Sequence, residues 1–201
     1  MAKQQLKTYV LAIDCKTDGI RGLCFWIGAV RMNLRDPKEE KAYFNGLVDP
    51  YLDCYCPLTD KYAVETIVPC AKMCMRLADT DKRCPVVYHS YDAMWTAFWD
   101  FYASHIDECN VVHDCPFLAV ENLFITSMSL DQRAREAQCP VRMFNIASML
   151  IMEGESEFTP RDEFLAKHKF SLIQNDWRQP AVYPVSVAFT TLSLFLCLIK
   201  H

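Results

Sequence analysis

Two aspartates in this chain each close an apolar run that is typical of a buried β-strand. Asp14 ends the run 8–14, and Asp114 follows the short run 110–113. Carboxylates at the ends of neighbouring strands can converge on one side of a sheet, which is how proteins assemble sites for divalent cations. Two-metal phosphodiester chemistry needs several such oxygens around ions about 3.5–4 Å apart. The two aspartates therefore indicate metal-dependent phosphodiester chemistry as the first function to consider.

The elements that would position these aspartates form an α/β domain. Apolar runs at 8–14, 23–31 and 41–48 predict an antiparallel meander of three strands. The rest of the chain alternates helical and strand-like patterns, with helices expected at 60–78, 90–105, 116–125, 145–152 and 182–199 and short strands at 110–113 and 141–144. We therefore expect a single domain over residues 1–201, with a mixed β-sheet of the meander and parallel strands, flanked by helices.

Local signals refine this outline. Thr59 or Asp60 is a suitable N-cap for the first helix, and Ser90 for the second, whose aromatic stripe is expected to lie in the core. Residues 153–181 are polar and are broken by glycine and proline, so we expect a loop there. No glycine-rich phosphate-binding loop and no internal repeat is present in the sequence.

Four segments resemble, in order, the DEDD superfamily of 3′–5′ exonucleases, which have an RNase H-like fold. Residues 9–33 (YVLAIDCKTDGIRGLCFWIGAVRMN) resemble the opening strand with its D-x-E-T motif and the following "IGAV" strand. Residues 93–102 and then 111–124 (VVHDCPFLAVENLF) resemble the family's middle segment, which is an amphipathic helix, a strand that carries the second Asp, and a further helix. Residues 143–154 (MFNIASMLIMEG) resemble the "D-I-x-S-L-L" segment. Residues 175–196 resemble the closing segment, where "H-N-P-L-x-D-A" supplies the general base and the last metal-binding Asp.

The resemblance implies that Asp14 and Asp114 are the first two metal-binding aspartates, but two of the four family carboxylates are missing. Lys16 stands where the family has Glu, and Val187 stands where it has the last Asp. Two lost negative charges and one added cation weaken the attraction for divalent ions. We expect at best weak binding of one ion, at Asp14 and Asp114.

The family's general base is also replaced. Val182 occupies the position of the histidine, whereas Tyr183 lies four residues before Val187, which is the spacing of the tyrosine-using branch and leaves a base-like group. Asp14 and Lys16 share a strand face, so we expect the Lys16 ammonium to form a salt bridge with Asp14 or Asp114. The alternatives are that Lys16 faces solvent, or that Asp18 and Glu121 rebuild a metal site.

Three functions remain open. The first is a degenerate, catalytically inactive exonuclease-like protein that binds a protein or single-stranded nucleic acid and needs no cofactor. The second is an active 3′–5′ exonuclease that uses Mg²⁺ or Mn²⁺ with Asp14, Asp114 and substitute acids. The third is a structural subunit that forms a homodimer through its apolar C-terminal region or its cysteine-rich segment 54–84.

Composition limits the partners and the location. The net charge is −4, which disfavours sequence-independent coating of nucleic acid. Residues 1–7 lack the features of a signal peptide, and the eleven cysteines are expected to be mostly reduced core residues of a cytoplasmic or nuclear protein, in the host cell if the chain is viral. The alternative for the cysteines is a metal site that uses Cys54, Cys56, Cys70, Cys74 and Cys84.

The C-terminal segment 182–199 is the one candidate for a membrane anchor. Pro184 and several hydroxyl side chains make it shorter and more polar than the roughly 20 apolar residues that a span requires. Its apolar residues recur at helical spacing. We expect a buried terminal helix and no membrane contact.

Overall fold

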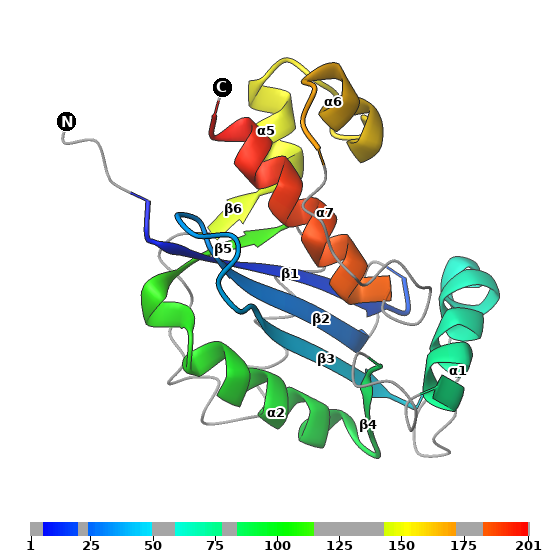
Figure 1. Cartoon of the computed structure of the whole chain (residues 1–201). Helices are drawn as coiled ribbons and strands as arrows, with labels where there is room; N and C mark the ends of the chain where they lie inside the picture. Colours follow the sequence, from blue (N-terminus) through cyan, green and yellow to red (C-terminus); the bar gives the residue numbers. More distant parts are fainter. Residues whose placement is uncertain are drawn as a thin grey trace.

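The computed structural model describes residues 6–19, 24–49, 59–77, 84–114, 143–171 and 183–200. Its centre is a mixed sheet of six strands in the order β4-β3-β2-β1-β5-β6 (Figure 1). The strands are β1 (Tyr9–Thr17), β2 (Cys24–Asn33), β3 (Ala42–Val48), β4 (Val86–Tyr88), β5 (Cys109–His113) and β6 (Met143–Asn145).

The pairing of the strands confirms the predicted α/β class. β1, β2 and β3 form an antiparallel meander, while β5 pairs parallel to β1 and β6 pairs parallel to β5. A mixed sheet of this kind, flanked by helices, is the RNase H-like arrangement expected from the sequence. β4, which pairs parallel to β3, was not predicted from the sequence.

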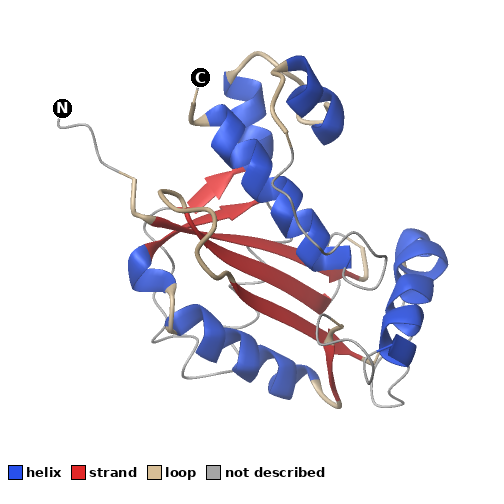
Figure 2. Cartoon of the chain, in the orientation of Figure 1, coloured by secondary structure: helices blue, strands red, loops and turns tan. Residues whose placement is uncertain are grey.

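Helices cover both faces of the sheet (Figure 2). On one face lie α2 (Tyr91–Ala103) and the continuous helix formed by η1 (Ala63–Ile67) and α1 (Val68–Leu77). On the other lie α5 (Ile146–Met152), α6 (Arg161–Lys167) and α7 (Tyr183–Leu198). η2 (Ile106–Glu108) is a short 3₁₀ turn before β5.

Alternation along β1 divides the core between the two faces. Leu11 and Ile13 pack with the aromatic side chains of α2, whereas Val10 and Ala12 pack with α5, α6 and α7. The aromatic residues of α2 are core residues as predicted, with Phe98 fully buried. Asp14 follows Val10 and Ala12 at the same two-residue spacing, so its side chain faces the side of the sheet that α7 covers.

The helix caps follow the predicted chemistry. The Ser90 hydroxyl accepts a hydrogen bond from the Ala93 amide at 3.2 Å, and the Asp60 carboxylate accepts one from the Ala63 amide at 2.8 Å. The predicted helix at 145–152 is present as α5, which Asn145 caps through the Ser148 amide at 3.0 Å. The helix expected at 116–125 lies outside the described residues.

The prediction of a loop over 153–181 was wrong in part, because α6 forms within it. This helix is only seven residues long, but it buries Phe164 and Leu165 and places Asp162 and Glu163 in its first turn. Acidic residues at a helix N-terminus are stabilised by the helix dipole. Burial of two adjacent side chains against α7 is a tertiary effect that the polar sequence did not reveal.

The C-terminal segment is a core helix, as expected. Val185, Ala188 and Phe189 of α7 are buried against the sheet. None of the helices within the described ranges is long and apolar enough to cross a membrane. These side chains are part of the core of the domain, and dimerisation through the C-terminal region stays a prediction.

Candidate functional site

The first part of the site lies on β1, where Asp14 and Lys16 form an ion pair. The Lys16 ammonium nitrogen is 2.7 Å from Oδ2 of Asp14. Both side chains are largely buried, with exposed fractions of 6% for Asp14 and 13% for Lys16. The predicted salt bridge is therefore present, and the alternative in which Lys16 faces solvent is wrong. The physical reason is strand alternation, which places residues two apart on the same face.

The second part lies at the end of β5, next to Asp14. The parallel register pairs Ile13 with His113, so Asp14 and Asp114 follow at neighbouring positions of adjacent strands. Neighbouring strands are about 4.8 Å apart, which brings the two carboxylates to one end of the sheet. The predicted convergence of these aspartates is thus provided by the sheet register.

The carboxylate of Asp114 is bound by the guanidinium group of Arg161, which lies at the start of α6. The Arg161 guanidinium donates to both carboxylate oxygens, from Nε to Oδ2 at 2.6 Å and from Nη2 to Oδ1 at 2.7 Å. Its Nη1 donates to the backbone carbonyls of Glu157 at 3.0 Å and Thr159 at 2.7 Å. Asp114 is 11% exposed in this pair. Arg161 is thus held by four hydrogen bonds, and a bidentate pair of this geometry is among the stronger ionic contacts in proteins.

The helix α7 reaches the same end of the sheet. Gly28 of β2 is the register partner of Asp14, and a Cβ at Gly28 would lie 2.6 Å from the backbone of Pro184 and Val185. The first turn of α7 therefore packs directly on β2 beside Asp14. This contact holds the start of α7 at the end of the sheet where Asp14 lies.

Three further residues were singled out in the sequence by its resemblance to the exonucleases. Val187 lies half-buried in the second turn of α7. Tyr183 is the first residue of α7, although its side chain is outside the described part of the chain, so its role as a base is untested. Val182 lies outside the described residues as well.

Asp18, which the sequence analysis considered as a substitute metal ligand, forms hydrogen bonds with backbone amides. Its carboxylate accepts hydrogen bonds from the backbone amides of Thr59 at 2.9 Å and Asp60 at 2.7 Å. Asp18 therefore ties the turn after β1 to the start of the η1 helix, and these bonds use the oxygens that a metal ion would need. Glu121, the other substitute acid considered, is outside the described residues.

Taken together, the site contains two carboxylates and two cations. Lys16 neutralises Asp14, and Arg161 neutralises Asp114. Divalent ions bind where oxygen ligands carry excess negative charge, so this donor set does not fit a pair of Mg²⁺ or Mn²⁺ ions. Among the described residues, no group of three or more His, Cys, Asp or Glu side chains is arranged to hold a metal. Whether a single ion binds remains a prediction.

Arg161 was missed by the sequence reasoning. It lies 47 residues after Asp114, in a stretch predicted to be a loop, and no spacing rule links the two positions. A local signal was present: Arg161 follows Pro160 and precedes two acids, which is a pattern for a helix start. That pattern predicts the helix but not the partner of its first side chain.

The cysteines within the described residues stand as thiols rather than as disulfides, as predicted for most of them. Burial raises the pKa of the Cys74 thiol to about 12, with further contributions from nearby Cys84 and Cys70. Burial likewise raises the pKa of the Cys109 thiol to about 11. Such thiols remain protonated at neutral pH and behave as core side chains. The metal-site alternative involves Cys54 and Cys56, which lie outside the described residues.

Comparison with known proteins adds no relative to this picture. No protein-family model matches the sequence, and no curated protein matches it either.

Proposed function

We propose that this chain is a degenerate member of the DEDD group of 3′–5′ exonucleases that has lost catalysis and serves as a binding module. The proposal rests on one observation: each aspartate at the family's metal positions is paired with a cation of the chain itself. Lys16 holds Asp14, and Arg161 holds Asp114 through both oxygens. To bind there, metal ions would have to displace two largely buried cations, which would then lose their partners.

The internal cations take over the structural part of the metals' role. In a metal-bound site, ions offset the mutual repulsion of clustered carboxylates; here Lys16 and Arg161 do so. They cannot supply what catalysis needs from metal, because an ammonium or guanidinium does not lower the pKa of a coordinated water to form hydroxide. The two ion pairs therefore stabilise the fold but do not support phosphodiester hydrolysis.

The partner we favour is a protein. The net charge of −4 disfavours general attraction to phosphates. A gel-shift assay with labelled single-stranded RNA and DNA separates the two kinds of partner. No shift at micromolar protein is expected if the module binds protein alone.

The proposal is tested by a degradation assay on labelled single-stranded RNA and DNA with Mg²⁺ or Mn²⁺. We expect no shortening of either strand above a protein-free blank. Magnesium-dependent degradation that disappears in Asp14→Asn and persists in Glu40→Gln, a change at an exposed carboxylate, would overturn the proposal. It would establish the alternative, an active metal-dependent exonuclease.

A further inference from the structure

Thr159 is the one hydroxyl residue of the sequence that directly precedes a proline. Of the ten prolines, only Pro160 follows a Ser or Thr. In the structure Glu157, Phe158 and Pro160 are exposed, and Thr159 between them is half-buried. Proline-directed protein kinases transfer a phosphoryl group to Ser or Thr in this sequence setting. The chain therefore offers such an enzyme a single acceptor.

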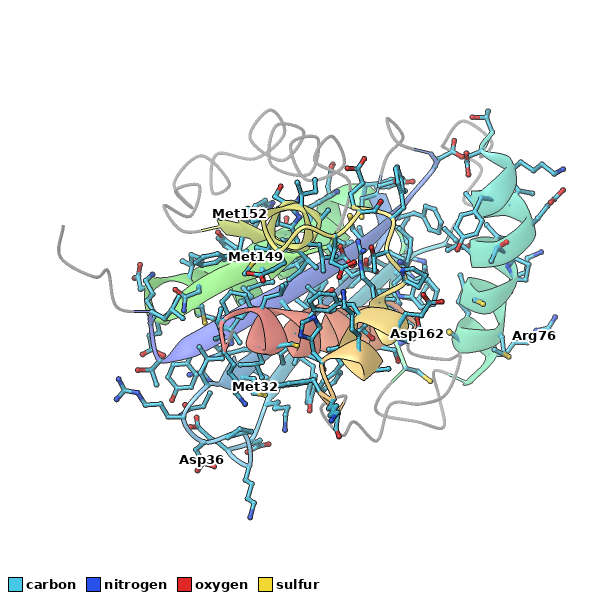
Figure 3. All side chains as sticks on the ribbon, turned by 90° about the horizontal axis from the view of Figure 1, so that it is seen from above. Met32, Asp36, Arg76, Met149, Met152 and Asp162 are labelled. Atoms are coloured by element: carbon cyan, nitrogen blue, oxygen red, sulfur yellow. The ribbon has the colours of Figure 1, made fainter. Side chains whose placement is uncertain are left out.

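The loop that carries Thr159 joins two helices on the outside of the domain. It lies at the top of the domain in Figure 1, and in Figure 3 it connects α5, where Met152 is labelled, to α6, where Asp162 is labelled. The Thr159 amide donates to the carbonyl of Ser156 at 3.0 Å, and the Thr159 carbonyl accepts from Nη1 of Arg161 at 2.7 Å. The loop is thus exposed to other proteins but fixed beside a guanidinium group.

The hydroxyl of Thr159 belongs to an ionic cluster. The Lys167 ammonium, near the end of α6, binds the carboxylate of Glu155. Hydrogen bonds from Lys167 and then from the Thr159 hydroxyl lower the pKa of the Glu155 carboxyl, and the nearby His168 acts in the same direction. Thr159, Lys167 and His168 therefore interact with one and the same carboxylate. A charge added to Thr159 would act directly on the Glu155–Lys167 pair.

We propose that Thr159 is a phosphorylation site and that its phosphate replaces Glu155 as the partner of the Lys167 ammonium. The hydroxyl oxygen of Thr159 attacks the γ-phosphorus of ATP on a proline-directed kinase. A new O–P bond forms while the bond from the γ-phosphorus to the β,γ-bridging oxygen breaks, so ADP leaves, and the hydroxyl proton passes to the base of the kinase. The inference does not depend on the proposed loss of catalysis.

The exchange of partners follows from charge and hydrogen bonding. A phosphothreonine carries a charge of about −1.5 to −2 at neutral pH and three acceptor oxygens. It has lost the hydroxyl proton that Thr159 donates to Glu155, and its charge repels that carboxylate. Lys167 is 64% exposed, so its ammonium is able to turn toward the more highly charged group. Phosphorylation thus changes which residue of the loop is bound to the end of α6.

Phosphorylation of the folded, full-length chain with a proline-directed kinase and ATP tests the site. The kinase is chosen for its activity on a synthetic peptide of residues 152–166. Intact-mass spectrometry should show one phosphate on the parent and on Thr159→Ser, and none on Thr159→Val, which lacks the hydroxyl. Circular dichroism melts check that each variant is folded. A parent that takes up no phosphate, or a Thr159→Val variant that takes up as much as the parent, would overturn the proposal.

A ³¹P NMR titration of the phosphorylated chain tests the partner. A nearby cation favours the dianion, so the phosphate pKa should be lower in the folded chain than in the same chain unfolded in urea. Lys167→Gln should raise the folded-state value by about 0.5 or more. Lys169→Gln is the matched control, because Lys169 is an exposed neighbour at the end of α6. Equal phosphate pKa values in the folded and unfolded chain, or equal effects of the two substitutions, would refute the assignment of Lys167.

Discussion

Arg161 binds both carboxylate oxygens of Asp114, across 47 residues of sequence, and so joins the start of α6 to the end of β5. The proposed resemblance to the DEDD exonucleases assigns a metal ion to this carboxylate. Here the same oxygens anchor a helix. A substitution that releases Asp114 therefore bears on the fold as well as on any remaining chemistry.

Arg161→Ala should lower the free energy of unfolding by about 2 kcal/mol, because it leaves the Asp114 carboxylate largely buried without its guanidinium. Urea denaturation measures the change. Lys61→Ala is the control, since Lys61 is 83% exposed in its pair with Glu65 and should matter little. Equal effects of the two substitutions would mean that the Arg161–Asp114 contact does not stabilise the fold.

Restoring the carboxylates alone should not restore a metal site. Lys16→Glu with Val187→Asp and Val182→His returns the family's residue types, but Arg161 would still occupy Asp114. We expect this triple variant to be less stable than the parent, because Lys16→Glu replaces the cation paired with Asp14 by a second acid. Manganese should raise its melting temperature only slightly.

Adding Arg161→Ala to the triple variant should free Asp114 for an ion. Manganese should then raise the melting temperature clearly, because an ion that binds only the folded state stabilises it. Measurable Mg²⁺-dependent exonuclease activity should appear with it. The expectation fails if manganese stabilises the triple and quadruple variants equally, since Arg161 would then not be the block.

Gly28→Ala should destabilise the protein by about 1–3 kcal/mol, because the new methyl group would overlap the backbone of Pro184 and Val185 and push α7 from the sheet. Gly46→Ala is the comparison: there the Cβ would meet the side chains of Phe44 and Met94 and not the backbone of another element. Thermal melts should show the larger loss for Gly28→Ala. The reverse order would contradict the close contact between α7 and β2.

Acid should weaken the fold partly through Glu39. Hydrogen bonds from Asn33 and then from Tyr9 lower the pKa of this carboxyl below its usual 4.5. A lowered pKa favours the ionised form in the folded state, so the stabilisation is present above pH 4.5 and is lost as the pH falls through the folded-state pKa. Urea melts from pH 6 to about pH 3 should therefore show a shallower decline for Glu39→Gln than for the parent. Glu40→Gln, at the exposed neighbouring residue, should follow the parent.

The sequence by itself determined the α/β class, the meander, the core helices α2 and α7, and the shared face of Asp14 and Lys16. Each of these depends on short-range rules: the alternation of side chains along a strand, the spacing of apolar residues along a helix, and caps such as Ser90. Short elements escaped prediction for the complementary reason. β4 and α6 are stabilised by neighbours that are distant in sequence, β4 by pairing with β3 and α6 by burying Phe164 and Leu165 in the core cluster that contains α7.

Only the tertiary structure decided the partners of the site residues. The β1–β5 register brings Asp114 beside Asp14, and the packing of α6 on α7 brings Arg161 to Asp114. The Asp18 carboxylate likewise accepts hydrogen bonds from the backbone amides of Thr59 and Asp60, about 40 residues further along the chain. Long-range ion pairs leave no spacing in a single sequence, because they depend on how whole elements pack and not on the local order of residues. That packing makes Asp14 and Asp114, which the sequence predicted as metal ligands, the partners of Lys16 and Arg161.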